Sequence, residues 1–173
     1  MRFFLPIIVM IAIFFSACGY KPSSKYAREV IGEKVSTSIK ISSSDPENSV
    51  IIKDAVDGAI ISIFHSSLRE RSQSDTHLVI SLKTPKYTPI EFDVNGFVIA
   101  YRMSLTLVIK KIRNGVSKIY TSMGTHDFSI TPNAIVTDQE RFEAIKFSAQ
   151  KAINSFIAQT SVEGARVSNT NPH

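Results

Sequence analysis

Hydrophobic and polar residues alternate along three stretches of the chain, and a fourth stretch is a short β-branched and aliphatic run, which together predict four β-strands. After the third strand, Asn114-Gly115 favours the two positive φ angles of a type I′ hairpin. A two-residue turn there places Lys111 opposite Lys118, and Gly124 is a candidate β-bulge. The predicted strands are residues 34–42, 77–83, 97–112 and 116–130.

Two segments repeat their apolar residues every three or four positions, which predicts amphipathic helices at residues 46–68 and 138–159. The first begins at Asp45-Pro46, an N-cap residue followed by a proline that suits the first helical position. Before the second, Thr137 and Glu140 have the spacing of a capping box.

The order of these elements, βαβββα, predicts an α+β fold. We expect a two-layer sandwich in which two helices pack on one face of a mixed four-stranded sheet. The proline-interrupted residues 83–96 are predicted to be a connection without a strand. The predicted α+β domain covers residues 34–160, and the polar residues 161–173 are predicted to be a disordered tail.

The second face of the sheet has no predicted cover, because both helices occupy the first. Its side chains mix apolar with basic groups, which favours a partner interface, and an ordinary solvated face is the alternative. The residues predicted on this face are Arg102, Thr106, Val108, Lys110, Ile119, Thr121 and Met123.

The first 17 residues have the pattern of a secretory signal peptide: Arg2, an uncharged apolar run over residues 3–15, and then Ser16 and Ala17. The run is shorter than the roughly 20 apolar residues that a membrane-spanning helix needs. Cleavage after Ala17 is therefore predicted, and an uncleaved anchor is the alternative.

Cys18 is the only cysteine, so an intrachain disulfide is excluded. The order Phe15-Ser16-Ala17-Cys18-Gly19 resembles a bacterial lipobox, which predicts lipid attachment at Cys18. A diacylglyceryl group with an additional N-acyl chain anchors stably, whereas one chain binds only marginally. Gly19 stands where an Asp would resemble an inner-membrane retention signal, so the outer membrane is the predicted location. Residues 18–33 are predicted to be the lipidated N-terminus and a tether.

The charge of the mature chain is mild. Removal of Arg2 with the leader leaves 19 Lys and Arg against 15 Asp and Glu, a formal charge of +4. In the envelope, the anionic partners are lipid headgroups and lipopolysaccharide, so we expect no nucleic-acid partner. Ordinary solubility charge explains the excess equally well.

Catalytic motifs with real specificity are absent from the sequence: there is no HExxH, GxSxG, CxxC or glycine-rich phosphate loop. The four histidines are far apart and show no metal-ligand spacing. His126 and Asp127 are strand neighbours that point to opposite faces and so cannot act as a base and its orienting group. We therefore expect no enzyme activity, no cofactor and no metal.

Three segments and the closing helix together resemble the lipopolysaccharide-assembly lipoprotein family, LptE. The segments are CGYKPSSKYA at Cys18 to Ala27, DPENSVIIKDAVDGAI at Asp45 to Ile60 and AYRMSLTLVIKKIRNG at Ala100 to Gly115. The resemblance covers nearly all of the mature chain and depends on the order of these segments.

The resemblance implies a lipoprotein anchored on the periplasmic side of the outer membrane. Such a protein enters the lumen of an LptD-like β-barrel translocon, plugs it, helps it assemble and assists lipopolysaccharide insertion. Its implied partners are the barrel, lipopolysaccharide and the membrane that holds its lipid. We nominate Arg102, Lys110 and Lys118 as lipopolysaccharide contacts. The alternative is a free-standing lipoprotein that binds a small envelope ligand in a pocket between sheet and helices.

Overall fold

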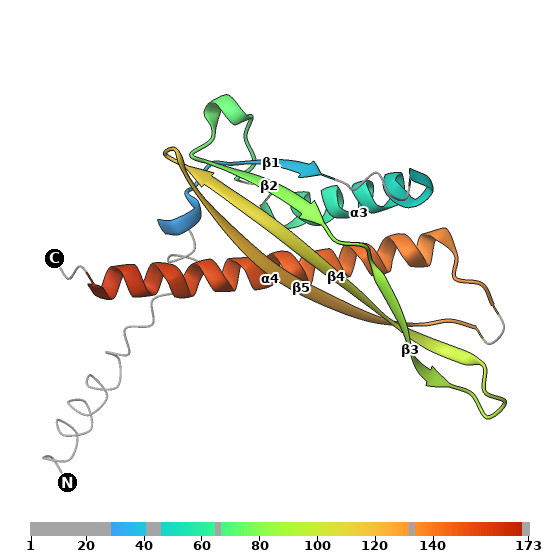
Figure 1. Cartoon of the computed structure of the whole chain (residues 1–173). Helices are drawn as coiled ribbons and strands as arrows, with labels where there is room; N and C mark the ends of the chain where they lie inside the picture. Colours follow the sequence, from blue (N-terminus) through green and yellow to red (C-terminus); the bar gives the residue numbers. More distant parts are fainter. Residues whose placement is uncertain (1–28, 41–45, 65–66, 132–133, 171–173) are drawn as a thin grey trace, which may run out of the picture.

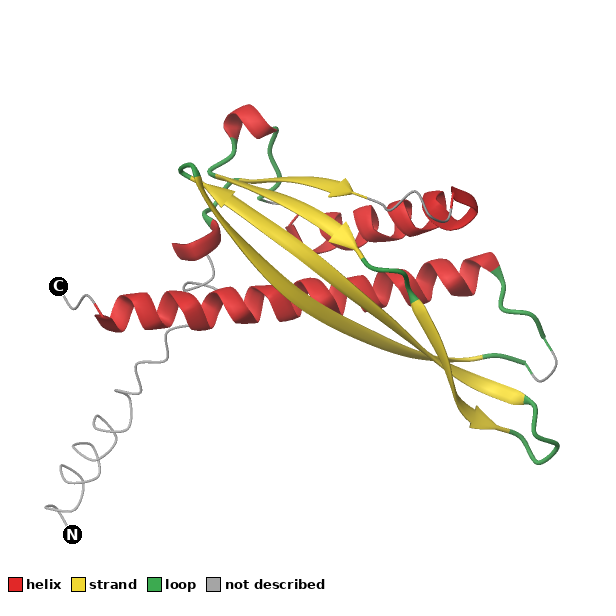
Figure 2. Cartoon of the chain, in the orientation of Figure 1, coloured by secondary structure: helices red, strands yellow, loops and turns green. Residues whose placement is uncertain are grey.

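The computed structural model describes residues 29–40, 46–64, 67–131 and 134–170 (Figure 1). Figure 2 shows the same view with helices and strands coloured separately. Its elements are β1 (Val35–Lys40), α3 (Pro46–Phe64), the 3₁₀ helix η1 (Arg71–Gln73), β2 (Thr76–Leu82), β3 (Lys86–Phe92), β4 (Val98–Arg113), β5 (Val116–Ser129) and α4 (Asp138–Thr170).

The strands form one mixed sheet with β4 at its centre. β1 pairs parallel with β2, and β2 pairs antiparallel with β4. One edge of β4 binds β2 and then β3, and its other edge pairs with β5 along the whole length of the hairpin. With the helices on one face, this is the predicted two-layer α+β sandwich.

The helices close the core on a single face of the sheet. Figure 1 shows α4 crossing the sheet with α3 beside it. From α4, Phe156 is fully buried and meets the Tyr120 ring edge to face, with 5.1 Å between the ring centroids. The other large buried side chains include Val56 and Ile60 of α3, Leu78 and Ile80 of β2, Met103, Leu105, Leu107 and Ile109 of β4, and Ile153 of α4.

The hairpin between β4 and β5 has the predicted geometry. Asn114 and Gly115 have φ angles of 50° and 76°, and the register places Lys111 opposite Lys118. The predicted bulge at Gly124 is wrong, because Leu105 faces Gly124 within an uninterrupted register. Glycine is needed there because the α4 backbone lies where a side chain would project.

The capping box at the start of α4 is confirmed. The Thr137 backbone N–H donates to Glu140 Oε2 over 2.8 Å, and the Glu140 backbone N–H donates to Thr137 Oγ1 over 3.2 Å. The hydrogen bonds from the Thr137 backbone and hydroxyl also lower the pKa of Glu140.

The predicted connection at residues 83–96 is wrong in part, because it contains β3. This strand pairs only with β4 and lies at the edge of the sheet. Pro89 has no N–H to donate, which is tolerated there because no second strand needs that hydrogen bond. The register shifts immediately after Pro89. The sheet described here therefore has five strands instead of four.

The tail prediction is wrong over residues 161–170, which continue α4. Thr160 and Ser161 are buried, and each hydroxyl donates to the carbonyl of Ile157. Packing against β5 stabilises this polar end of the helix, and composition alone does not indicate such packing. The segment was therefore predicted to be disordered. Residues 171–173 lie outside the described part.

The predicted tether also overlaps the folded domain. Residues 29–31 are helical, and Ile31 is buried in the core with 4% of its surface exposed. Residues 32–34 connect this turn to β1. The signal peptide, Cys18 and the rest of the tether lie outside the described residues.

Candidate functional site

The face of β4 and β5 opposite the helices is open, as the sequence predicts: no described element covers it. Ile119 and Met123 of β5 are 63% and 60% exposed there. Ile119 lies directly opposite the exposed Lys110, and Met123 lies opposite Thr106. We call this surface of β4 and β5 the open face. It combines apolar and basic side chains on a long two-stranded hairpin, which suits a partner surface more than a catalytic site.

Arg102 lies on the open face but is already paired. Its Nε and Nη2 donate to Asp127 Oδ1 and Oδ2, each over 2.7 Å. This two-pronged contact raises the pKa of Arg102 and lowers that of Asp127. An incoming phosphate would have to compete with Asp127 for these donors.

The three nominated lipopolysaccharide contacts do not form one cluster. Arg102 and Lys110 share the open face but are eight residues apart along β4, roughly 26 Å at the rise of a strand. Lys118 lies opposite Lys111 in the register of β4 and β5, on the face that the helices cover. There its Nζ donates to Glu163 Oε2 over 2.6 Å. Their role as lipopolysaccharide contacts stays a prediction. Cys18 lies outside the described residues.

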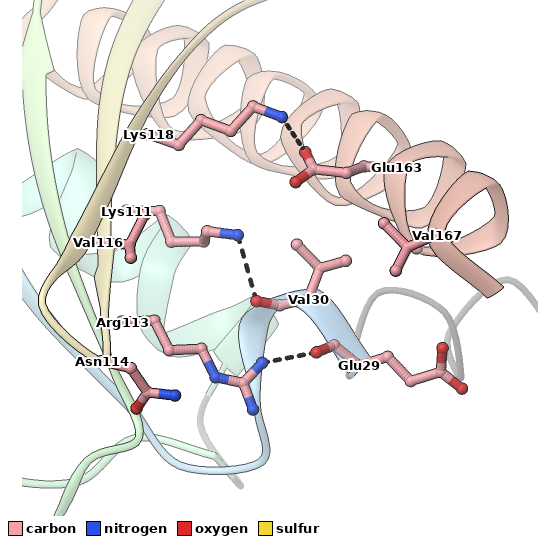
Figure 3. A pocket seen from close by; sticks show the side chains of 10 residues that line it. Glu29, Val30, Lys111, Arg113, Asn114, Val116, Lys118, Glu163 and Val167 are labelled. Atoms are coloured by element: carbon pink, nitrogen blue, oxygen red, sulfur yellow. Dashed lines mark hydrogen bonds and ion pairs between the residues drawn. The ribbon is translucent and has the colours of Figure 1, made fainter. Parts of the chain in front are cut away.

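A pocket of about 410 Å³ lies beside the β4–β5 turn, between the end of α4 and the helical turn at residues 29–31 (Figure 3). We call it the hairpin pocket. Its wall combines three basic side chains, two acidic ones and three valines. The lining residues are Glu29, Val30, Lys111, Arg113, Asn114, Val116, Lys118, Glu163, Gly164 and Val167.

Two of its cations hold the start of the described chain. Lys111 Nζ donates to the Val30 carbonyl over 3.3 Å, and Arg113 Nη1 donates to the Glu29 carbonyl over 2.6 Å (Figure 3). These carbonyls are neutral, so neither bond cancels the charge of the cation. The hairpin therefore fixes the point where the N-terminal segment joins the domain.

Glu163 on α4 forms the opposite wall. Its Oε2 accepts a hydrogen bond from Tyr120 Oη over 2.8 Å as well as the one from Lys118. Burial acts to raise the pKa of Glu163, but these two hydrogen bonds and the charge of Lys111 outweigh it and lower the pKa. Burial and the adjacent carboxylate raise the pKa of Tyr120.

The cations of the pocket repel one another. Burial lowers the pKa of Lys111, and the charges of Lys118 and Arg113 lower it further, against the opposing effect of Glu163. The pocket is thus short of negative charge, which is the condition under which an anion binds favourably.

Glu163→Gln tests the electrostatics of this wall. We expect it to lower the free energy of unfolding by about 1 kcal/mol at pH 7, because a charged acceptor of two hydrogen bonds is lost. The folded pKa of Glu163 is lowered, so this contribution is complete above the unfolded value of about 4.3 and is lost as the pH falls through the folded value. Urea unfolding at pH 7 and pH 3 measures it.

Glu91→Gln on the exposed edge strand β3 is the control and should change little at either pH. An equal loss for Glu163→Gln at both pH values would contradict the ion-pair explanation.

The sequence indicated only part of this site. The hairpin turn brings Lys111 and Lys118 together as predicted, but the wall formed by Glu163 was missed because that segment was predicted to be disordered. A signal was present: Thr160 and Gly164 follow Phe156 at successive spacings of four, so small residues continue the buried face of the helix.

Two histidines are held by structural contacts. His77 is buried on β2, with its Nδ1 2.8 Å from Ser36 Oγ and its Nε2 3.2 Å from Ser38 Oγ. His126 packs on Phe147 of α4, whereas Asp127 pairs with Arg102 on the open face. The prediction that His126 and Asp127 point apart is therefore confirmed. Among the described residues, no group of three or more His, Cys, Asp or Glu side chains has metal-binding geometry.

Comparisons with known proteins define the fold. No protein-family model and no curated protein matches the sequence. The structure is similar to that of a candidate lipoprotein from Caulobacter crescentus CB15, with a TM-score of 0.51 and 8% identity over 87% of this chain and 98% of that one. It also matches rare lipoprotein B from Shewanella oneidensis, with a TM-score of 0.46 and 10% identity over 79% and 99% of the two chains. At such identity the likeness extends to the fold alone.

None of the helices in the described ranges is long and apolar enough to cross a membrane.

Proposed function

We propose that the chain is an outer-membrane lipoprotein anchored through Cys18. Its domain plugs and helps assemble an LptD-like β-barrel translocon and assists lipopolysaccharide insertion into the outer leaflet. We propose no catalytic role. The observation that carries this proposal is the open face, where Ile119 and Met123 are exposed beside Lys110 on a long hairpin.

The chemistry of the open face suits the inside of a barrel. The lumen of an outer-membrane barrel is polar, whereas its lipid-facing surface is apolar. A face with hydroxyl, basic and a few apolar side chains can form hydrogen bonds with such a wall and pack against it. The Arg102–Asp127 pair also presents a locally neutral surface near the other end of the hairpin.

The anchor and the fold support the same proposal. The lipobox-like order around Cys18 motivates acylation, and Gly19 motivates transfer to the outer membrane. The fold is shared with a candidate lipoprotein of similar size, and the sequence resembles the LptE family in the order of its segments. Lys110 is exposed on the open face, whereas Arg102 is held by Asp127 and Lys118 by Glu163.

Recovery of the partner from native membranes tests the proposal. The tagged full chain, purified from detergent-solubilised outer membranes, should retain a large β-barrel in a constant ratio. Mass spectrometry of the same preparation should show Cys18 as an acylated N-terminal residue. An acylated chain without a barrel would contradict plugging, and an unmodified Cys18 would contradict the anchor.

The hairpin pocket favours a second candidate, a free-standing lipoprotein that binds a small envelope ligand. This candidate predicts a monomer in detergent and normal surface lipopolysaccharide after depletion of the protein. The barrel proposal predicts a complex and a loss of surface lipopolysaccharide.

A further inference from the structure

We propose that the hairpin pocket binds the phosphodiester headgroup of a glycerophospholipid in the membrane that holds the lipid anchor. The headgroup would hold the domain at the bilayer through a contact separate from the open face. Only the membrane location depends on the proposed acylation of Cys18, because the pocket itself lies within the described structure.

The charge of the lining matches a phosphodiester. Lys111, Arg113 and Lys118 face two carboxylates, which leaves one positive charge in excess. Glu163 is already bound by Lys118, and Figure 3 shows the Glu29 carboxylate directed away from Arg113. The uncompensated charge therefore lies at Lys111 and Arg113, and a phosphodiester carries a single negative charge.

The same two side chains retain suitable donors. Lys111 carries three N–H donors and Arg113 carries five, and their hydrogen bonds within the described structure are the single contacts to the carbonyls of Val30 and Glu29. A guanidinium and an ammonium side by side can bind two phosphate oxygens at once. The carbonyl contacts hold both groups in position before a ligand arrives.

The size and the valines of the pocket favour a lipid over a bare ion. The volume of about 410 Å³ falls within the usual range for small-molecule pockets, which is well above what one phosphate group fills. Val116 and Val167 are 71% and 61% exposed at its wall, where the glycerol and first acyl carbons of a lipid would contact them.

The pocket lies close to the point where the chain leads back to the lipid anchor, and so to the membrane. Glu29 forms part of its wall and is the first described residue, and Cys18 lies eleven positions earlier. Eleven residues span at most about 40 Å. The headgroups of the anchoring leaflet are therefore the anionic groups that the pocket can reach whenever the anchor is in place.

A negative charge at the wall of the pocket tests the proposal without touching the backbone contacts. Val167→Asp should weaken binding of monomeric dihexanoyl phosphatidylglycerol to the full mature chain in detergent by at least about tenfold, because the new carboxylate repels the phosphate. Val162→Asp lies on the same helix, is 53% exposed and does not line the pocket, so it should bind like the wild type. NMR chemical-shift changes that saturate with lipid concentration measure the affinity. The lipid partitions into detergent micelles to the same extent for each variant, so the variants can be compared directly.

A second pair of variants removes the cations themselves. Lys111→Gln with Arg113→Gln should also weaken binding at least about tenfold. Lys40→Gln with Lys86→Gln makes an equal charge change at two exposed positions outside the pocket and should not weaken it. Inorganic phosphate should bind more weakly than the phosphatidylglycerol. Lipid A should not displace the bound phosphatidylglycerol. Binding that does not saturate, or that is equal in Val167→Asp and Val162→Asp, would overturn the assignment. So would inorganic phosphate that binds as tightly as the phosphatidylglycerol, or lipid A that binds more tightly than it. Because the lipid is added to the purified chain, the result depends neither on acylation of Cys18 nor on barrel recovery.

Discussion

Gly124→Ala is expected to lower the free energy of unfolding by about 3 kcal/mol. At this position α4 crosses β5 so closely that a Cβ atom would lie 2.5 Å from the Ala152 backbone nitrogen and would also overlap the Ser148 carbonyl oxygen. The obstruction is backbone, so no side-chain rotation relieves it, and α4 must move away from the sheet. Urea unfolding followed by circular dichroism measures the loss.

Gly58→Ala in α3 is the matched control. Its Cβ would lie 3.5 Å from Lys146 Cε, an ordinary contact, and alanine favours a helix interior over glycine. We expect a gain of up to about 1 kcal/mol. If both variants had the same effect, the close approach of α4 would not explain why glycine occupies position 124.

Ile119→Glu combined with Met123→Glu is expected to abolish recovery of the barrel. Both side chains are exposed on the open face, so the free domain should fold normally. In a closed interface, two desolvated carboxylates would each cost several kcal/mol, enough to reduce the affinity more than 100-fold. Co-purification from outer membranes measures the effect, with circular dichroism as the check on folding.

Val50→Glu combined with Ile61→Glu makes the same change on α3, where the side chains are 64% and 57% exposed. This control should retain the barrel. A barrel that stays bound to the open-face variant, or that is lost from both, would contradict the proposed interface.

Features that depend on neighbouring residues were predictable from the sequence. The Asn114-Gly115 turn sets its own φ angles and therefore the register of β4 against β5. The Thr137 and Glu140 pair marks the start of α4 through hydrogen bonds within four residues. The open face followed from the same alternation once both helices were placed on the other face of the sheet.

Features that depend on distant partners were not predictable in this way. β3 exists because β4 is long enough to pair with β2 and then with a second strand along the same edge, where Pro89 is tolerated. The end of α4 is stabilised by Lys118 and Tyr120, which lie more than forty residues earlier. The hairpin pocket depends on that end of α4, so the sequence placed Lys111 opposite Lys118 but did not indicate the cavity.

The most direct test of the central claim, that the open face contacts a barrel, is photo-crosslinking in intact cells. A photoreactive residue at position 119 should give one adduct whose partner is identified by mass spectrometry as a large outer-membrane β-barrel, and the same residue at position 61 should give none. No barrel adduct at position 119, or equal adducts at both positions, would contradict it.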